Sequence, residues 1–307
     1  MLELKQKYGD LAPTERVLLG AGPSGVDPRV LRAMSTPLLG HLDPEFIEIM
    51  NDTRDLLRYV FQTENPMTLP MSGTGSSGMD TILSNLLEPK DKAIVAVCGV
   101  FGERMVDIAG RSGAEVKVIN GEWGRIIEAE QVEAAFKEMP DAKVFAFAHA
   151  ETSTGILQPV DDIVRIAHEH GALVAMDCVT SLGGTPVLLD EWGIDAAYSG
   201  TQKCLSCPPG LAPISMNAKA QEALHNRKTK VPSWYLDLTM IERYWGQERF
   251  YHHTAPISMV YALREALRII AEEGLEARWA RHELNAKAFT AGCEAMGLKP
   301  WAQEGYR

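Results

Sequence analysis

The stretch AIVAVC, residues 93–98, is apolar nearly throughout, as expected for a strand that is buried on both faces of a sheet. Similar short runs, rich in β-branched residues, alternate along the chain with amphipathic stretches. The predicted strands are Met67–Met71, Ala93–Val97, Glu115–Ile119, Lys143–Ala148, Leu173–Asp177, Asp195–Tyr198 and Leu211–Met216. The predicted helices are Ser76–Leu87, Gly102–Arg111, Glu128–Glu138 and Val160–His170. This alternation predicts an α/β fold, a mostly parallel seven-stranded sheet with helices on both faces.

The pattern changes after residue 255, where apolar residues begin to recur at helical spacing. These residues are Val260, Leu263, Leu267 and Ile270. Gly274 is expected to end this helix in a left-handed cap, and a second helix is expected from Glu276 to about Met296. The expected domains are a large domain over 20–255, an N-terminal arm over 1–19 and the start of a smaller C-terminal domain over 256–307.

The composition excludes several classes of partner. The 307 residues carry a formal net charge of -11, which opposes binding to nucleic acid or to anionic membranes. No apolar run approaches the roughly 18 residues of a membrane span, and the N-terminal MLELKQKYGD lacks the apolar core of a secretory signal. The five cysteines are an odd number in a large chain, which favours reduced thiols. We therefore expect a cytoplasmic protein, with a peroxisome or mitochondrion as the alternatives in a eukaryote.

Cys204 and Cys207 form a C-x-x-C pair, which is found in metal and redox sites. A metal site needs a second pair or a His at ligand spacing, and none follows. A redox pair opens a helix, whereas this pair precedes Pro208-Pro209-Gly210. The pair is therefore interpreted as structural, and no metal is expected.

Ligands of open α/β sheets bind beyond the carboxyl ends of the strands, so the residues at the strand ends are the candidates for a site. The first predicted strand is followed by SGTGSSG, residues 72–78, which opens a helix. Small residues at a helix N-terminus favour binding of a phosphate. The stretch lacks the lysine of a nucleotide P-loop and the G-x-G-x-x-G spacing, and taken alone it is equally consistent with a turn that binds nothing.

The next two strand ends carry one aromatic residue and one polar cluster. Phe101 follows the second strand, where it could pack on a helix or face a ligand. HAETSTG, residues 149–155, follows the fourth strand, and polar side chains there need hydrogen-bond partners if they are buried. His149 is interpreted as a hydrogen-bonded structural histidine.

Asp177 and Lys203 are the two charged residues expected to be buried at strand ends. Asp177 ends the apolar strand that begins at Leu173, and Lys203 follows Asp195–Tyr198 in the stretch SGTQK. A buried carboxylate needs a cation or hydrogen bonds, and burial makes an amine a better nucleophile near neutral pH. Considered alone, the two could simply form an ion pair with each other.

The four features together have one common use. Pyridoxal phosphate needs donors for its phosphate, a stacking surface for its ring, a carboxylate for its pyridine nitrogen and a lysine for its aldehyde. The stretch 72–78, Phe101, Asp177 and Lys203 supply that set, in order, on one edge of one sheet. The sequence therefore predicts a pyridoxal phosphate site with Lys203 as its lysine.

The chain resembles class V aminotransferases of fold type I, most closely the alanine–glyoxylate / serine–pyruvate aminotransferase group, from about Leu19 to its end. The combination of motifs is specific to this group. The motifs are GAGPSGVDPRVLRAM (20–34), YVFQTENPMTLPMSGTGSSG (59–78), HAETSTG (149–155), DCVTSLGGTP (177–186), YSGTQKCLSCPPG (198–210), RKTKVPSWYLDL (227–238) and YHHTAPISMVYALRE (251–265).

The resemblance implies a role for each matching residue. Lys203 would form the Schiff base, Asp177 would pair with the pyridine nitrogen, and Phe101 would stack on the ring where relatives often have Trp. The residues implied around the phosphate and the ring hydroxyl are Thr74, Gly75, Ser76, Gln202 and, near the hydroxyl, Thr152. Gly22 would lie against the substrate, and in a homodimer with shared active sites Tyr251 and Thr254 would complete the phosphate site of the partner subunit. Ser76 departs from relatives that have His there.

The resemblance also implies a part that the chain does not show. The family binds the substrate α-carboxylate through an arginine of the C-terminal lobe, beyond the position of Arg307. We therefore expect the α/β C-terminal lobe to be incomplete in this chain.

The function implied by the resemblance is transfer of an amino group from alanine or serine to glyoxylate, giving glycine and a 2-keto acid. Three alternatives stay open. A ureidoglycine–glyoxylate aminotransferase shares much of the N-terminal pattern. A class V lyase or cysteine desulfurase needs a nucleophilic Cys over the site and usually stacks His on the ring. A non-catalytic binding protein on this fold would have no use for both Asp177 and Lys203.

Overall fold

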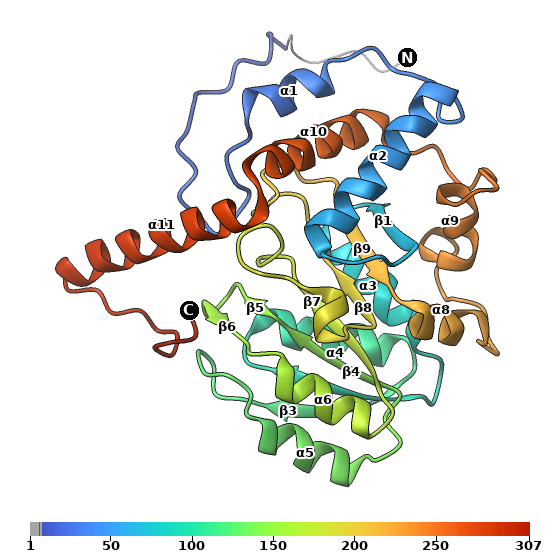
Figure 1. The fold of residues 1–307 in the computed structure, drawn as a ribbon, viewed down its shortest axis with the longest axis vertical. Coiled ribbons are helices and arrows are strands. Elements are labelled where there is room, and N and C mark those ends of the chain that lie inside the picture. Colours follow the sequence, from blue (N-terminus) through green and yellow to red (C-terminus); the bar gives the residue numbers. More distant parts are fainter. Residues whose placement is uncertain (1–5, 7) are drawn as a thin grey trace.

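The computed structural model describes Gln6 and residues 8–307, and it has a single large sheet at its centre (Figure 1). The sheet has seven strands in the order β1-β9-β8-β7-β4-β2-β3. Their bounds are Met67–Ser72 (β1), Lys92–Val97 (β2), Glu115–Asn120 (β3), Val144–Ala148 (β4), Leu173–Asp177 (β7), Ala196–Tyr198 (β8) and Leu211–Met216 (β9). β9 runs antiparallel to both neighbours and the other pairs are parallel. All seven predicted strands are confirmed, with ends that differ by at most one residue.

The position of each strand follows from its composition. β4, VFAFA, is an interior strand of the sheet and is buried along its whole length, and β2 is buried from Ala93 to Val97. β3 lies at an edge and is mostly half-buried, with Lys117 among its residues. Charged side chains on an edge strand oppose pairing with another chain.

Helices cover both faces of the sheet, with α3 packed beside α4 and α5 packed beside α6 (Figure 1). These helices are Gly75–Leu86 (α3), Val100–Arg111 (α4), Ala129–Glu138 (α5) and Asp161–Glu169 (α6). The other elements are α1 (Pro28–Met34), α2 (Pro44–Phe61), the hairpin β5 (Ala150–Glu151) and β6 (Ile156–Leu157), α7 (Leu189–Trp192), α8 (Ala218–His225), the short helix Trp234–Leu236 and α9 (Leu238–Trp245). Gly78 lets α3 lie close to the sheet, since a Cβ there would be 3.1 Å from the Cβ atoms of Tyr198 and Ala212.

Two helices follow residue 255. In α10 (Ile257–Glu273), the four apolar residues predicted at helical spacing are all buried, and the helix packs on α1 and α2. Gly274 has φ +82°, but its ψ of 141° is extended, so the predicted left-handed cap is wrong in that angle. α11 (Leu275–Ala295) projects along one side of the molecule (Figure 1). Between 257 and 307 the structure has helices and loops and no strand.

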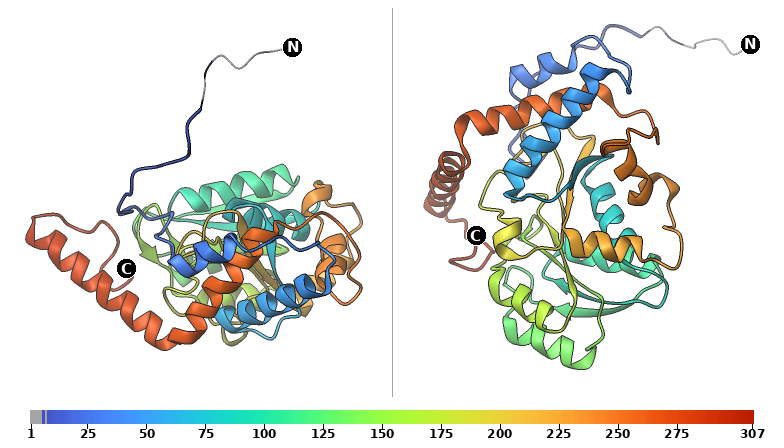
Figure 2. Two further views of the ribbon diagram at one scale, coloured as in Figure 1. Left: turned by 90° about the horizontal axis from the view of Figure 1, so that it is seen from above. Right: turned by 45° about the vertical axis from the view of Figure 1, so that its right-hand side comes forward.

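The N-terminal segment is described only in part, since residues 1–5 and 7 of the expected arm lie outside the described residues. Residues 8–19 are exposed and extend away from the sheet (Figure 2). Among the described residues, no helix has the length and apolar character needed to cross a membrane.

Candidate active site

The segment between β1 and α3 has the form of an anion-binding loop. Thr74 is the N-cap of α3 and makes no side-chain cap hydrogen bond, while Thr74 and Ser76 are both exposed. Gly73 has φ +146°, and a Cβ on it would lie 2.5 Å from the hydroxyl oxygen of Ser77. The loop therefore presents an open helix N-terminus, with its positive potential, at the carboxyl end of the sheet.

Gln202 lies beside this loop and has an unsatisfied polar atom. Its Oε1 is buried and has no hydrogen-bond partner in the described part of the chain. A Cβ on Gly200 would lie 3.1 Å from this oxygen and 3.3 Å from the Cα of Gly75, so Gly200 is flanked by both. Because the two ends of an amide are interchangeable by rotation, Gln202 can turn its Nε2 toward an anion held by the loop. Gln202 and the loop fit a phosphate group.

Asp177, at the end of β7, is a buried carboxylate with two hydrogen-bond donors. Only 3% of it is exposed; Oδ1 accepts from the Val179 amide at 2.8 Å and Oδ2 accepts from the Tyr198 hydroxyl at 2.8 Å. Burial raises the pKa of Asp177 to about 6, and these two hydrogen bonds limit the rise. The negative charge of Glu151 raises this pKa further and the positive charge of Arg104 lowers it.

Tyr198 is a site residue that sequence reasoning did not find. It is fully buried at the end of β8, and its Cα is the register partner of Asp177 on β7. Register partners on adjacent parallel strands project to the same face, which brings the hydroxyl to the carboxylate. Knowledge of the β7–β8 register would have revealed the pair.

Phe101 and the anion-binding loop are connected by a third residue. Phe101 is half-buried in the first turn of α4, and the Arg104 guanidinium lies 4.9 Å from the centre of its ring. Arg104 also donates from Nη1 to the Ser76 hydroxyl at 3.0 Å. The predicted stacking residue and the predicted phosphate loop are therefore neighbours, joined by Arg104.

Thr152 follows the short strand β5. Its hydroxyl is hydrogen-bonded to the hydroxyl of Thr180, which lies three residues after Asp177. Thr152 is half-buried and thus belongs to the same strand-end cluster as Asp177.

Lys203 lies on the loop after β8 and does not pair with Asp177. It is half-buried, so the expectation of a buried amine is wrong, and its Nζ donates to the Ala21 carbonyl at 2.5 Å. The Asp177 carboxylate takes its hydrogen bonds from Val179 and Tyr198, so the simple ion pair between the two charged residues is excluded. Lys203 lies past the end of the strand, where only another loop covers it.

The covering loop is residues 21–24 of the N-terminal part. Ser24 donates its amide to the Gln202 carbonyl and its hydroxyl to the Lys203 carbonyl, both at 2.8 Å. A Cβ on Gly22, which has φ +129°, would lie 2.6 Å from both Nζ and Cδ of Lys203. Gly22, predicted to border the substrate, is thus in contact distance of the lysine.

Tyr251 and Thr254 lie near each other, with 3.5 Å between their hydroxyl oxygens, and 49% of Tyr251 is exposed. Their segment is held near the loop by His253, whose Nε2 is hydrogen-bonded to the Ser72 hydroxyl at 2.7 Å. No hydrogen bond of the described residues joins Tyr251 or Thr254 to Thr74, Gly75 or Ser76. Their assignment to the partner's site stays a prediction.

His149 and the cysteines have structural environments. His149 Nδ1 is hydrogen-bonded to the Ser181 hydroxyl at 2.9 Å, and burial lowers its pKa to about 4. Burial also raises the thiol pKa of the following four cysteines: Cys98, Cys178, Cys204 and Cys207. A thiol with a raised pKa is a poor metal ligand and nucleophile. Residues 8–307 contain no group of three or more His, Cys, Asp or Glu side chains that could hold a metal ion.

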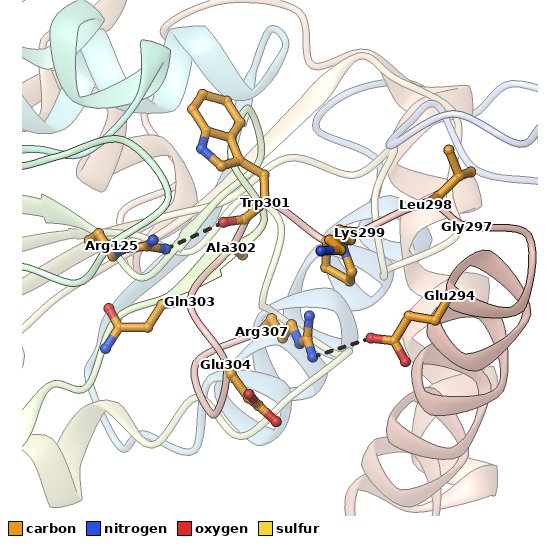
Figure 3. A pocket seen from close by; sticks show the side chains of 11 residues that line it. Arg125, Glu294, Gly297, Leu298, Lys299, Trp301, Ala302, Gln303, Glu304 and Arg307 are labelled. Atoms are coloured by element: carbon orange, nitrogen blue, oxygen red, sulfur yellow. Dashed lines mark hydrogen bonds and ion pairs between the residues drawn. The ribbon is translucent and has the colours of Figure 1, made fainter.

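A cavity of about 590 Å³ lies elsewhere, beneath the C-terminal tail (Figure 3). Its walls include Arg125 from the loop before α5 and Trp301 and Arg307 from the tail. Arg125 donates to the Trp301 carbonyl at 3.5 Å, and Arg307 pairs with Glu294 at 3.7 Å (Figure 3). The cavity contains none of the predicted site residues, so it is separate from the strand-end cluster.

Known proteins share both the sequence and the fold of this chain. The sequence profile of the family Aminotransferase class-V matches residues 17–298. The chain belongs to the class V aminotransferase family. It is 43% identical over 293 residues to the alanine–glyoxylate aminotransferase of Rattus norvegicus, covering 94% of this chain and 70% of that protein. It is 40% identical over 308 residues to the (S)-ureidoglycine–glyoxylate transaminase of Bacillus subtilis, covering 94% and 74%.

Solved structures of class V aminotransferases have the same fold. The crystal structure of an alanine–glyoxylate aminotransferase from Nostoc sp. superposes with a TM-score of 0.97 at 46% identity, covering 99% of this chain and 80% of that one. The family resemblance and the α/β fold predicted from the sequence are confirmed.

Proposed function

We propose that this class V aminotransferase uses pyridoxal phosphate to move an amino group from a small amino acid, alanine or serine, to glyoxylate, giving glycine and a 2-keto acid. One observation carries the proposal. An open helix N-terminus, an aromatic side chain, a buried carboxylate and a lysine amine each lie at or just beyond the carboxyl end of a strand of one sheet. That set is the one that this cofactor requires.

The residues that would hold the cofactor are Thr74, Gly75, Ser76 and Gln202 around the phosphate, with Phe101, Thr152 and Asp177 around the ring. The unpartnered Oε1 of Gln202 and the uncapped first turn of α3 support this placement. When bound, pyridoxal phosphate supplies an aldehyde that reacts with amines and a ring that withdraws electrons from the donor's α-carbon.

Lys203 would both bond the aldehyde and move protons. Its amine, held at the Ala21 carbonyl, would take the proton from the α-carbon of the amino donor once the donor has displaced it. Gly22 leaves the space in which this amine moves, because any side chain there would overlap it.

Asp177 would hold a proton on the pyridine nitrogen. Its pKa of about 6 keeps most of the carboxyl ionised at neutral pH, and the Tyr198 hydroxyl supports the ionised form. A protonated ring nitrogen would strengthen the carboxylate form in turn, because opposite charges lower the pKa of an acid.

Two kinds of amino donor are compatible with the similar proteins, and they define two versions of the proposed function: alanine or serine in the first, and (S)-ureidoglycine in the second. The relatives include an alanine–glyoxylate aminotransferase and an (S)-ureidoglycine–glyoxylate transaminase at 43% and 40% identity. The test offers alanine, serine and (S)-ureidoglycine separately with glyoxylate and measures glycine and the keto acid. Turnover with ureidoglycine alone would replace the first version by the second.

The cofactor assignment is tested on the purified protein. We expect a yellow protein in which borohydride fixes the cofactor to the peptide that contains Lys203, as read by mass spectrometry. Lys203→Ala should lose turnover by a factor of about 10³ or more and keep only non-covalent cofactor. Wild-type turnover in that variant would refute the role of Lys203, and a colourless protein without the adduct would favour a binding protein on this fold.

A lyase or desulfurase is disfavoured by four of the five thiols, since burial raises the pKa of Cys98, Cys178, Cys204 and Cys207. Release of sulfide from cysteine at a rate above that of amino transfer would favour a desulfurase over an aminotransferase.

The proposed homodimer shares its sites through Tyr251 and Thr254. Neither residue is tied to the loop of its own chain, and about half of Tyr251 is exposed. Mixing Lys203→Ala with Tyr251→Ala subunits tests this sharing, because a mixed dimer would have one site with both wild-type residues. Absence of any gain in activity on mixing would place Tyr251 in its own chain's site or outside both.

A further inference from the structure

Glu151 is a buried carboxylate that the proposed mechanism does not use. Only 1% of it is exposed, and no Lys, Arg or His side chain of the described residues forms an ion pair with it. A buried carboxylate without a cation is costly unless hydrogen-bond donors surround it. Its surroundings therefore have to explain why it is tolerated.

The donors come from the start of another element, helix α4. Oε2 of Glu151 accepts from the backbone amides of Phe101 at 3.1 Å and Gly102 at 3.3 Å. Oε1 accepts from the amide of Ser153 at 3.1 Å and from its hydroxyl at 2.6 Å, and the Ser153 hydroxyl accepts from the amide of Val100 at 3.0 Å. Glu151 and Ser153 together satisfy the first three amides of α4.

The helix cannot cap itself, because its N-cap residue is Gly99, which has no side chain. A Cβ on Gly99 would lie 2.5 Å from both Cδ of Glu151 and Oγ of Ser153. Glycine at this position leaves the space into which the carboxylate enters. The negative charge also lies at the positive end of the helix, which is a stabilising arrangement.

Helix α4 carries two residues of the candidate site within its first two turns. Phe101 donates one of the amides bound by Glu151, and Arg104 lies over the Phe101 ring and donates to Ser76 in the anion-binding loop. The carboxylate thus fixes the first turn of α4, which carries Phe101 and precedes the turn that carries Arg104.

We propose that Glu151 is a positioning residue, which caps α4 from a distant strand and thereby holds Phe101 and Arg104 in place for the cofactor. The inference rests on the proposed function, because it concerns the same site. Glu151 touches the amides of the helix, and it acts on the ring through Phe101 and on the phosphate loop through Arg104.

The test compares Glu151→Ala, Glu151→Gln and the control Glu103→Gln in the full chain. Glu103 is an exposed carboxylate in the first turn of the same helix, so its removal changes the charge there and leaves the cap intact. Two quantities are measured: amide hydrogen exchange of residues 100–102 in the cofactor-free protein, and the dissociation constant and visible circular dichroism of added pyridoxal phosphate.

For Glu151→Ala we expect amide exchange at residues 100–102 to become about tenfold faster, since a lost cap of this strength changes local opening by that order. The dissociation constant should rise about tenfold and the visible circular dichroism should weaken. Glu151→Gln keeps an acceptor oxygen and should show smaller changes of the same sign, and Glu103→Gln should match wild type.

Each outcome decides the proposal. If the Ala variant does not fold, the Gln variant carries the test. If a folded Glu151 variant exchanges faster but keeps the affinity and circular dichroism of wild type, Glu151 is a purely structural cap and the positioning role is overturned. Unchanged amide exchange in a folded variant would overturn the proposal as well. If wild-type protein binds no pyridoxal phosphate, the proposed function fails and the inference fails with it, a result distinct from wild-type binding with unaffected variants.

Discussion

Asp177 and Lys203 are two charged residues of the candidate site, and their surroundings in the fold differ. Asp177 is 3% exposed, within the sheet, and its donors come from the adjacent strand and from its own loop. Lys203 is half-buried, past a strand end, and its amine donates to the carbonyl of Ala21 in the N-terminal part of the chain. In the proposed mechanism Asp177 keeps one protonation state, which suits its place in the core, and Lys203 moves, which suits its place between two loops.

Asp177→Asn removes the buried carboxylate and should give the largest loss of activity. The amide cannot carry the negative charge that keeps the ring nitrogen protonated, so we expect kcat to fall by about 10²- to 10³-fold. Steady-state transamination measures the loss. The control is Asp195→Asn, a buried aspartate hydrogen-bonded to Asn217 at the far end of β8, whose folded fraction should keep normal kcat. Equal activities of Asp177→Asn and wild type would remove Asp177 from the mechanism.

Gly22→Ala fills the space around the Lys203 amine. The new Cβ would lie 2.6 Å from the lysine amine and would displace it, because the end of a lysine side chain moves more easily than the backbone. Displacement by about 1 Å lowers kcat by up to about 10²-fold. Gly25→Ala is the matched control, since nothing lies within 4 Å of a Cβ at Gly25. A normal rate in Gly22→Ala with slow Gly25→Ala would contradict the assignment.

Tyr198→Phe removes one of the two hydrogen-bond donors of the Asp177 carboxylate. The hydroxyl stabilises the ionised carboxyl, so its loss should raise the pKa of Asp177 above its present value of about 6. We expect kcat to fall about tenfold and the acid limb of the pH profile to move upward by about one unit. Tyr244→Phe, which loses a hydrogen bond to the His41 carbonyl, should leave that limb unchanged. An unmoved acid limb in Tyr198→Phe would show that the hydroxyl does not act on Asp177.

The smallest effect concerns stability without cofactor. Below the usual pKa of 3.8, Asp177 is protonated in both the folded and the unfolded chain; as the pH rises from there through about 6, the unfolded chain ionises first and the folded protein loses stability. A side-chain amide cannot ionise, so Asp177→Asn should gain about 5 °C in Tm over wild type at pH 7 relative to the difference at pH 4. Thermal scans of the cofactor-free proteins at both pH values measure it. A Tm difference between the variant and wild type that is the same at both pH values would mean that burial does not raise the pKa of Asp177.

Much of the fold and of the candidate site could be predicted from the sequence, because strands and the residues at their ends are indicated by short local patterns. Seven short apolar runs correspond to the seven strands, and the ends of five of them carry predicted site residues. The interactions between elements were harder to predict. The ion pair that Lys203 and Asp177, considered alone, could have formed is absent because the β7–β8 register places Tyr198 opposite Asp177 and leaves Lys203 five residues later on a loop. The cap on α4 comes from Glu151, about fifty residues away, which no local pattern indicates.

The bonds from Ser24 to the loop of Lys203 span 179 residues of sequence. During synthesis on the ribosome, residues 21–24 emerge long before residues 202 and 203, to which Ser24 donates its hydrogen bonds in the folded protein. The lysine loop can close only after residue 203 has been made and folded. A nascent chain that has not reached residue 203 therefore lacks both the lysine of the candidate site and the partners of residues 21–24.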